Sequence, residues 1–142
     1  MPADLFNELM DAMAEDLADK LTTRHVERKL IVPSEEKDAR LEAGVVCLVT
    51  TGGGEFANWS GREGELGNVE FTLFCPIKVA EKATTSEDVE RAELKLLDEL
   101  LDWAQSAKPA ILGDTVPQRW RGSAQTSAPL GWVILEMVAR NV

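Results

Sequence analysis

The chain has 142 residues, of which 44% are hydrophobic and 28% charged, and its net charge is −10 at pH 7. This length suits one domain with a full hydrophobic core, and no apolar run approaches the roughly 20 residues that span a bilayer. The first four residues, Met-Pro-Ala-Asp, do not open a basic segment followed by an apolar one. We therefore expect neither a membrane protein nor a secreted one.

The negative charge is concentrated in two segments. Residues 1–22 carry six acids and one lysine, and residues 86–107 carry seven acids and two basic residues. The rest of the chain is balanced and lacks the clustered lysine and arginine of a protein that grips phosphates. The acidic segments are either solvated faces that keep the protein soluble or a negative wall past which nucleic acid slides without sticking.

The N-terminal half reads as a helix followed by two strands. A helix is predicted over Asp4–Thr22, with apolar side chains along one side and acids along the other. Arg24–Val32 alternates like an amphipathic edge strand that Pro33 ends, and the charged stretch Ser34–Glu42 predicts an exposed connection with one helical turn. The continuous apolar run in Val45–Thr51 is typical of a strand buried on both faces.

A glycine-rich stretch, Gly52–Gly67, follows this strand. Three consecutive glycines resemble part of a phosphate-binding loop, but the Gly-Lys-Ser/Thr continuation and the helix start are missing, so a hairpin connection is favoured. The stretch also holds the large aromatic residues Phe56 and Trp59. Their side chains either fold back onto the core or are left exposed for a partner.

The central part of the chain changes from a strand period to a helix period. Val69–Val79 alternates apolar and polar residues and predicts a strand. The apolar positions then follow a helical period up to Pro109, and Thr85 with Asp88 three residues later predicts a capping start.

The apolar arc of this helix is wider than contact with one sheet requires. Leu94 and Leu101 lie beyond the main apolar stripe and widen the arc to about 200°. Because a helix lying on a sheet needs roughly half of that, we expect the surplus to meet a second protein surface. Glu90 and Glu93 also lie within the arc, near the N-terminal end, where the helix dipole favours acids.

The C-terminal part predicts a β-hairpin. Gln118–Thr126 places Trp120 on one face and Arg119 and Arg121 on the other. The last strand, Trp132–Arg140, is apolar on both faces for much of its length, so it is either central in the sheet or half covered by another molecule. The whole order predicts a single α+β domain over residues 1–142, with an antiparallel or mixed sheet of four to five strands and two α-helices on one face.

Few residues in the sequence suit catalysis or metal binding. His25 is the only histidine, and no Cys-x-x-Cys pair is present. Cys47 and Cys75 lie in apolar strands, where we expect small buried hydrophobes, with a disulfide between adjacent strands as the alternative. We predict no catalytic residue, no cofactor and no metal site, and hence a protein that is not an enzyme.

The layout resembles the tail terminator proteins of long-tailed bacteriophages, the lambda-type terminator family. The resemblance is carried by the opening amphipathic helix, the connection Gly52–Gly67, the strand from Val69 to Phe74 running into Pro76, the helix Val89–Trp103, and the hairpin Arg119–Ala139. It covers most of the chain.

The resemblance implies a homohexameric ring at the head-proximal end of the tail tube, which stops tube polymerisation and offers a surface to the connector of the head. The implied partners are further copies of the chain, the tube protein and the head-tail connector protein. The genome passes through the ring without sequence-specific contact, and no membrane is involved. The implied location is the virion tail, after assembly in the host cytoplasm.

Aromatic and arginine side chains are the usual energetic anchors of such interfaces. The predicted interface residues are Phe56, Trp59, Arg62, Leu94, Leu101, Arg119, Trp120, Arg121 and Trp132. Core packing is the alternative for Trp120. The alternative function is that of a small cytosolic ligand-binding or enzymatic α+β domain, with the glycine-rich stretch as the lid of a pocket.

Overall fold

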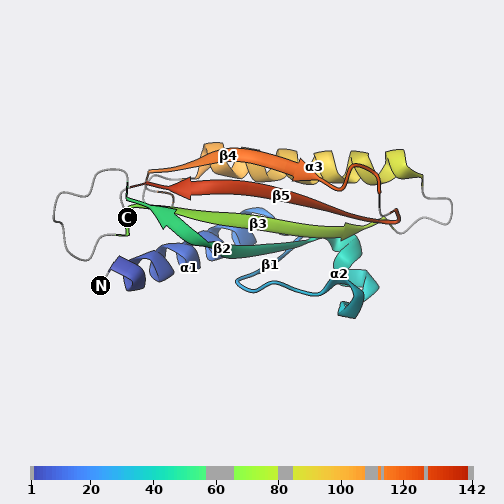
Figure 1. Ribbon diagram of the computed structural model, residues 1–142. Helices are drawn as coiled ribbons and strands as arrows, with labels where there is room; N and C mark the ends of the chain where they lie inside the picture. Colours follow the sequence, from blue (N-terminus) through green and yellow to red (C-terminus); the bar gives the residue numbers. More distant parts are fainter. Residues whose placement is uncertain are drawn as a thin grey trace.

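The fold is a five-stranded sheet with two long helices packed on it (Figure 1). The computed structural model describes residues 2–56, 66–79, 85–107, 112, 114–126 and 128–140. The elements in chain order are α1 (Pro2–Lys20), β1 (His25–Glu27), a 3-10 turn (Pro33–Glu35), α2 (Asp38–Ala43), β2 (Val45–Glu55), β3 (Asn68–Lys78), α3 (Ser86–Ser106), β4 (Thr115–Gly122) and β5 (Leu130–Ala139).

The sheet is mixed and its strands do not follow chain order. Their order across the sheet is β1-β2-β3-β5-β4, with β1 parallel to β2 and all other neighbours antiparallel. The last strand, β5, therefore lies inside the sheet between β3 and β4; Val133, Leu135 and Met137 are buried in the main core, whereas Trp132 and Ile134 on its other face are half-buried. The predicted α+β class and the predicted C-terminal hairpin are both confirmed.

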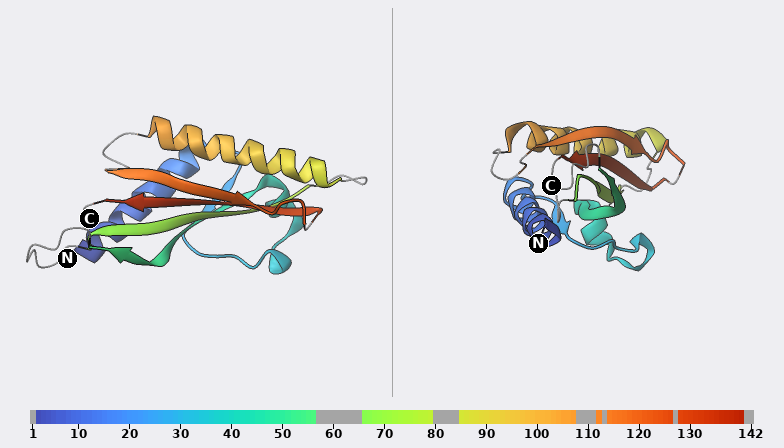
Figure 2. Two further views of the ribbon diagram at one scale, coloured as in Figure 1. Left: turned by 45° about the horizontal axis from the view of Figure 1, so that its top comes forward. Right: turned by 60° about the vertical axis from the view of Figure 1, so that its left-hand side comes forward.

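One face of the sheet carries the main core, and both long helices cover it. Leu48, Leu73 and Leu135 lie opposite one another on neighbouring strands and are fully buried. Side chains from α1, such as Met13, and from α3, such as Leu100, belong to the same buried cluster. In the left view of Figure 2, α3 runs along the strands and α1 crosses them diagonally. The two helices therefore share one face, as predicted.

A smaller apolar cluster covers one end of the opposite face. Ile31 and Leu41, the latter from α2, are buried there against Val45 and Cys47 of β2, with Phe74 of β3 partly buried beside them. This cluster explains why Val45–Thr51 begins as a strand buried on both faces.

The segment between α1 and β2 contains a shorter strand than predicted and a charged stretch that ion pairs hold in place. The first strand is only three residues long, because β1 pairs with the first three residues of β2, and Leu30 and Val32 are left exposed. The predicted strand Arg24–Val32 is therefore wrong beyond Glu27. Arg40 forms ion pairs with Glu27 and Glu36, which tie the connection together.

The glycine-rich stretch begins as part of the sheet. Strand β2 continues through the three glycines to Glu55, with a register shift between Thr50 and Gly54. A Cβ atom on Gly54 would lie 2.5 Å from the backbone oxygen of Asn68, so this close pairing requires glycine. The predicted loop Gly52–Gly67 is thus strand at its start, and residues 57–65 lie outside the described chain.

Helix α3 begins where the capping residues predict. The Asp88 N–H donates to the Thr85 hydroxyl at 3.3 Å, and the Thr85 N–H donates to the Asp88 carboxylate at 2.9 Å. This reciprocal pair is a capping box, and it supplies two of the hydrogen bonds that a helix start lacks. The prediction for Thr85 and Asp88 is confirmed.

The two outer strands of the sheet are short or irregular. One edge is formed by the three-residue β1, which pairs only with Val45–Cys47, and beyond it by the rest of β2 up to Glu55, whose register with β3 shifts between Thr50 and Gly54. The other edge, β4, contains Pro117, and its register with β5 shifts between Pro117 and Arg119. Proline removes a backbone donor and a register shift bends the strand, so neither edge offers a long regular row of hydrogen-bonding groups.

Candidate functional site

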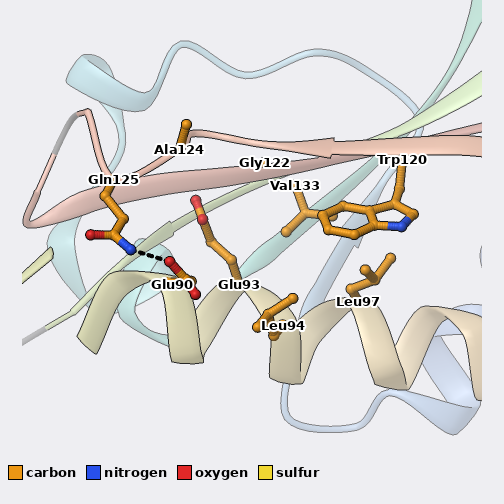
Figure 3. Close-up of a pocket in the computed structure, with 9 residues that line it drawn as sticks. All are labelled: Glu90, Glu93, Leu94, Leu97, Trp120, Gly122, Ala124, Gln125 and Val133. Atoms are coloured by element: carbon orange, nitrogen blue, oxygen red, sulfur yellow. Dashed lines mark hydrogen bonds between the residues drawn. The ribbon is translucent and has the colours of Figure 1, made fainter. Parts of the chain in front are cut away.

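A pocket of about 390 Å³ lies between α3 and the β4–β5 hairpin (Figure 3). Its volume is within the range of small-ligand sites. Its walls come from two turns of α3, from the end of β4 and the residues after it, and from β5. The lining residues are Glu90, Glu93, Leu94, Leu97, Trp120, Gly122, Ala124, Gln125 and Val133.

The most unusual member of the pocket is Glu93, a carboxylate with 5% of its surface exposed. Its Oε2 atom accepts three hydrogen bonds: from the Ser123 hydroxyl at 2.6 Å, the Ser123 N–H at 3.2 Å and the Trp132 N–H at 3.0 Å. Burying a carboxylate is costly unless donors replace the lost water, and these three donors do so. Glu93 thereby fastens α3 to both strands of the hairpin.

Glycine allows the carboxylate to approach the hairpin so closely. A Cβ atom on Gly131 would lie 2.6 Å from a methyl carbon of Val89 and 2.7 Å from Oε2 of Glu93. Because Val89 and Glu93 are four residues apart on α3, a side chain at position 131 would push the helix away from β5. Gly131 is therefore part of how the site is built.

The second carboxylate oxygen of Glu93, Oε1, lies next to Gly122, which also lines the pocket. In the described part of the chain, Oε2 takes all three hydrogen bonds to this carboxylate, and Oε1 takes none. A Cβ atom on Gly122 would lie 3.3 Å from Oε1, so the absence of a side chain there leaves Oε1 uncovered from β4. The pocket thus contains an anchored carboxylate with one oxygen available to a ligand.

The rim of the pocket is apolar and exposed. Trp120 has 51% of its surface exposed and Leu94 has 44%, whereas Leu97 and Val133 are buried. Figure 3 shows the Trp120 indole lying between β4 and α3, above Leu97. The arrangement combines a fixed negative charge with a flat aromatic wall.

The outer end of the pocket is polar. The side-chain amide of Gln125 donates to the Glu90 carboxylate, as the dashed line in Figure 3 indicates. Among the described residues that line the pocket, two are acidic and none is basic. The pocket therefore suits a ligand with a positive charge and an apolar stem.

Two of the predicted interface residues lie together in the structure, and the other described ones lie at separate places. Leu94 and Trp120 line the same pocket, and both are exposed. Leu101 is partly buried against the main core, so the chain itself covers part of the wide apolar arc. Trp132 is half-buried on the inner strand β5, and its backbone N–H donates a hydrogen bond to the Glu93 carboxylate.

The predicted arginines lie away from the pocket rim. Arg119 and Arg121 are exposed on β4, and both form ion pairs with Glu136 of β5. In the second pair, Nη2 of Arg121 lies 3.9 Å from Oε1 of Glu136. Phe56 is 56% exposed just after β2, beside a separate hollow that Phe6 also lines. The remaining predictions, Trp59 and Arg62, lie outside the described residues.

The helix dipole does not explain why Glu93 lies within the apolar arc of α3. The helix begins at Ser86, so Glu93 lies in the third turn rather than at the N-terminal end where a dipole effect operates. The informative feature is its spacing: Glu93 lies four residues after Val89 and four before Leu97, both of which are buried. An acid between two core positions of one stripe indicates a buried carboxylate with its own donors. No comparable spacing in the sequence marks Ser123, which supplies two of the three donors to Glu93.

The chain's nucleophilic groups are not assembled into a catalytic arrangement in the described residues. Ser123 is buried and donates its hydroxyl proton to Glu93, while His25 is exposed on β1, the opposite edge strand. No group of three or more potential metal ligands occurs among the described side chains. No helix in the same part of the chain is long and apolar enough to cross a membrane.

Both cysteines are buried free thiols. Cys47 lies opposite Phe74, so Cys75, the next residue on β3, points to the other face of the sheet. This explains why the alternative of a disulfide between these adjacent strands is not realised. Burial raises the pKa of both thiols above the ordinary cysteine value.

The chain matches no protein-family model, and no curated protein matches it either.

Proposed function

We propose that this protein is a structural subunit of a bacteriophage tail. Its copies form a homohexameric ring that caps the head-proximal end of the tail tube, ends tube polymerisation and offers a surface to the head-tail connector. The proposal rests on the resemblance of the chain's layout to lambda-type tail terminators, and the helix and strand order of the fold agrees with that layout.

The single observation that carries the assembly argument is the pairing of Trp120 and Leu94. These two large apolar side chains are 51% and 44% exposed and line one pocket on the surface. A tryptophan exposed beside a leucine is typical of an interface anchor, because both lose water contact when a neighbour covers them. In a ring, each protomer buries one patch against a different patch of the next.

The charge distribution supports a role next to nucleic acid without binding it. The segments with the excess acids become α1 and α3, which lie on the same face of the sheet. A surface rich in carboxylates repels phosphates, so DNA that passes such a surface is not retained. The partners that the resemblance implies are the tube protein, the connector and further copies of the chain, in the virion tail and in the host cytoplasm during assembly.

Electron microscopy of the purified protein, with light scattering at several concentrations, tests the proposal. We expect closed rings of six copies and a mass that tends to that of a hexamer as the concentration rises. A second assay adds the protein to polymerising tail tubes, whose growth should stop at one end. A protein that stays monomeric at every concentration and leaves tube length unchanged would contradict the proposal.

Deletion of Gly53–Glu63 tests the part of the proposal that concerns the glycine-rich stretch. We expect the deleted protein to fail in joining tails to heads, because Phe56, Trp59 and Arg62 are removed with the stretch. Since the deletion also removes the end of β2, circular dichroism must first show that the deleted protein folds. Normal joining with the deletion would remove this stretch from the interface.

A second candidate function is ligand binding by a monomeric domain, and the pocket around Glu93 favours it. A volume of about 390 Å³ and an anchored carboxylate are features of small-molecule sites. A strict monomer that binds a metabolite in this pocket would support the second candidate over the first.

A further inference from the structure

We infer that the pocket between α3 and β4 is a binding site for the guanidinium group of an arginine side chain carried by a partner polypeptide. The inference concerns the chemistry of this pocket and does not depend on ring formation. It follows from the anchoring of Glu93, the aromatic wall of Trp120 and the charge of the surrounding helix.

The carboxylate of Glu93 is held ready to accept a ligand. Three donors converge on Oε2, which matches the acceptor-only character of an ionised carboxylate. These bonds fix the orientation of the group, so Oε1 is presented next to Gly122 of the pocket lining without further loss of side-chain freedom. With 5% of the residue exposed, water screens the charge less than it would on the surface.

The rest of the pocket selects a cation with a flat head and an apolar stem. Trp120 offers an indole, the aromatic ring that attracts cations most strongly. Leu94 and Leu97 line the same space and suit the methylene groups of a long side chain. Guanidinium satisfies these surroundings better than ammonium, because it is planar, stacks on aromatic rings and is more weakly hydrated.

Charge complementarity also favours a cation at this position. Residues 86–107, which contain α3, carry seven acids and two basic residues, and Glu90 is a second carboxylate at the pocket. The pocket's described lining includes no lysine or arginine of the chain itself, so Oε1 of Glu93 is not neutralised from within this lining. A positive group from outside would supply that missing charge.

A polypeptide is favoured as the source because the apolar rim extends beyond the carboxylate. Trp120 and Leu94 are two of the six large hydrophobic side chains that are exposed among the described residues, and they flank the same opening. An arginine inserted between them would bring its own backbone and neighbouring side chains over the rim, and would so cover both.

Binding of two matched tripeptides, acetyl-Gly-Arg-Gly-amide and the same peptide with citrulline, tests the inference. Citrulline has nearly the shape of arginine but no charge. We expect the arginine peptide to shift the NMR signals of the Trp120 indole and the Ser123 amide with an affinity on the order of millimolar, and the citrulline peptide to bind at least about tenfold more weakly. Equal affinities for the two peptides would overturn the inference.

Two substitutions in the pocket and one outside it complete the test. Glu93→Gln retains an oxygen for the three donors but removes the charge, and it should weaken the arginine peptide by about tenfold or more. Trp120→Ala removes an exposed wall and should weaken it about threefold to tenfold. Asp98→Asn removes one negative charge from an exposed position of α3 and should change binding less than about twofold.

The outcomes separate the possible sources of the cation. If Glu93→Gln and Trp120→Ala bind the arginine peptide as well as the unchanged protein does, the pocket is not the site. If free argininamide binds more than about tenfold tighter than the tripeptide, the pocket takes a small molecule, and the polypeptide part of the inference is wrong. The peptides are titrated at a protein concentration at which light scattering shows monomers, because in the proposed ring a neighbouring copy would cover Trp120 and Leu94.

Discussion

The indole N–H of Trp103 donates a hydrogen bond to the carboxylate of Asp16 at 2.8 Å, and so joins α3 to α1 across 87 positions of the sequence. Trp103 is 2% exposed, and the two helices otherwise meet through apolar side chains of the main core. This bond gives the apolar packing of the helix pair a directional contact.

Asp16→Ala should lower the free energy of unfolding by about 1–3 kcal/mol, because the buried indole N–H loses its acceptor. Urea unfolding followed by circular dichroism measures the change. Asp19→Ala, an exposed position on the same helix, removes the same charge and should change stability by less than about 0.5 kcal/mol. Equal effects of the two substitutions would mean that charge, and not the hydrogen bond, matters here.

Glu93→Ala should be among the most destabilising substitutions in the chain, with a loss of about 3 kcal/mol or more. It leaves three donors on Ser123 and Trp132 without their acceptor and opens a void next to Gly131. Glu93→Gln should cost less than half as much, because its amide oxygen still accepts. Chemical denaturation of both variants measures the difference, and Glu90→Ala provides the exposed control. Similar losses for alanine and glutamine would show that the donors are satisfied in another way.

Thr85→Ala should destabilise the start of α3 through loss of the capping box, by less than Glu93→Ala destabilises the whole domain. Hydrogen exchange of the first-turn amides, compared with those near Leu100, should show faster exchange confined to the start. Uniform acceleration along α3 would contradict this local role.

The stability that Asp88 contributes should depend on acid pH. Hydrogen bonds from the Thr85 backbone and side chain hold the pKa of this carboxyl below its ordinary value of 3.8. Because the pKa is lower in the folded state, the contribution is complete above about pH 4 and is lost as the pH falls through the folded-state pKa. The unfolding midpoints of the unchanged protein and Asp88→Asn should therefore differ at pH 6 and draw closer as the pH falls below 3.8. A difference that is constant over this range would contradict the assignment.

Both cysteine thiols should resist modification in the folded protein. Burial raises the pKa of Cys47 and Cys75, so the reactive thiolate is scarce at pH 8 and the reagent has no access to it. Ellman's reagent should release almost no colour from the native protein and a signal equal to two thiols in urea. Rapid reaction of one thiol without denaturant would indicate local opening of the sheet near that cysteine.

Leu94→Glu tests whether the rim of the pocket is an assembly surface. Leu94 is 44% exposed, so the substitution should leave the fold intact while placing a charge where a neighbour would pack. We expect the mass of the assembly to fall to that of the monomer in light scattering. Leu30→Glu, at a position that is 63% exposed in the connection after β1, provides the control and should assemble normally. Unchanged assembly of Leu94→Glu would place the interface elsewhere.

The sequence predicted those elements whose patterns are local. The strand around Phe71 alternates cleanly, and the Thr85 capping box marks the start of α3, so both were found nearly to the residue. The start of β4 at Thr115 and the extension of β2 to Glu55 were not found, because proline and glycine normally argue against a strand. Pairing with a neighbouring strand decides these positions, and that partner is remote in sequence.

Of the residues that form the pocket, the sequence singled out the large apolar ones but not the hydrogen-bonded carboxylate. Leu94 lies beyond the main apolar stripe of its helix, and Trp120 is predicted as an aromatic interface anchor with core packing as the alternative. Glu93 was seen within the apolar arc but ascribed to the helix dipole, since its donors on Ser123 and Trp132 are supplied 30 and 39 residues later. A buried carboxylate can be recognised only when the residues that satisfy it are known.

Pro117 and the shifted register of β4, together with the brevity of β1, limit how copies of this molecule can meet. Sheets that join edge to edge grow without end, because each added strand offers the next one the same template. In the described part of the chain, β1 is short and the exposed part of β2 and β4 both shift in register, so neither side of the sheet offers a long regular template. Association of copies would then rely on side-chain contacts, and these give a closed ring only where the rotation from one copy to the next closes on itself.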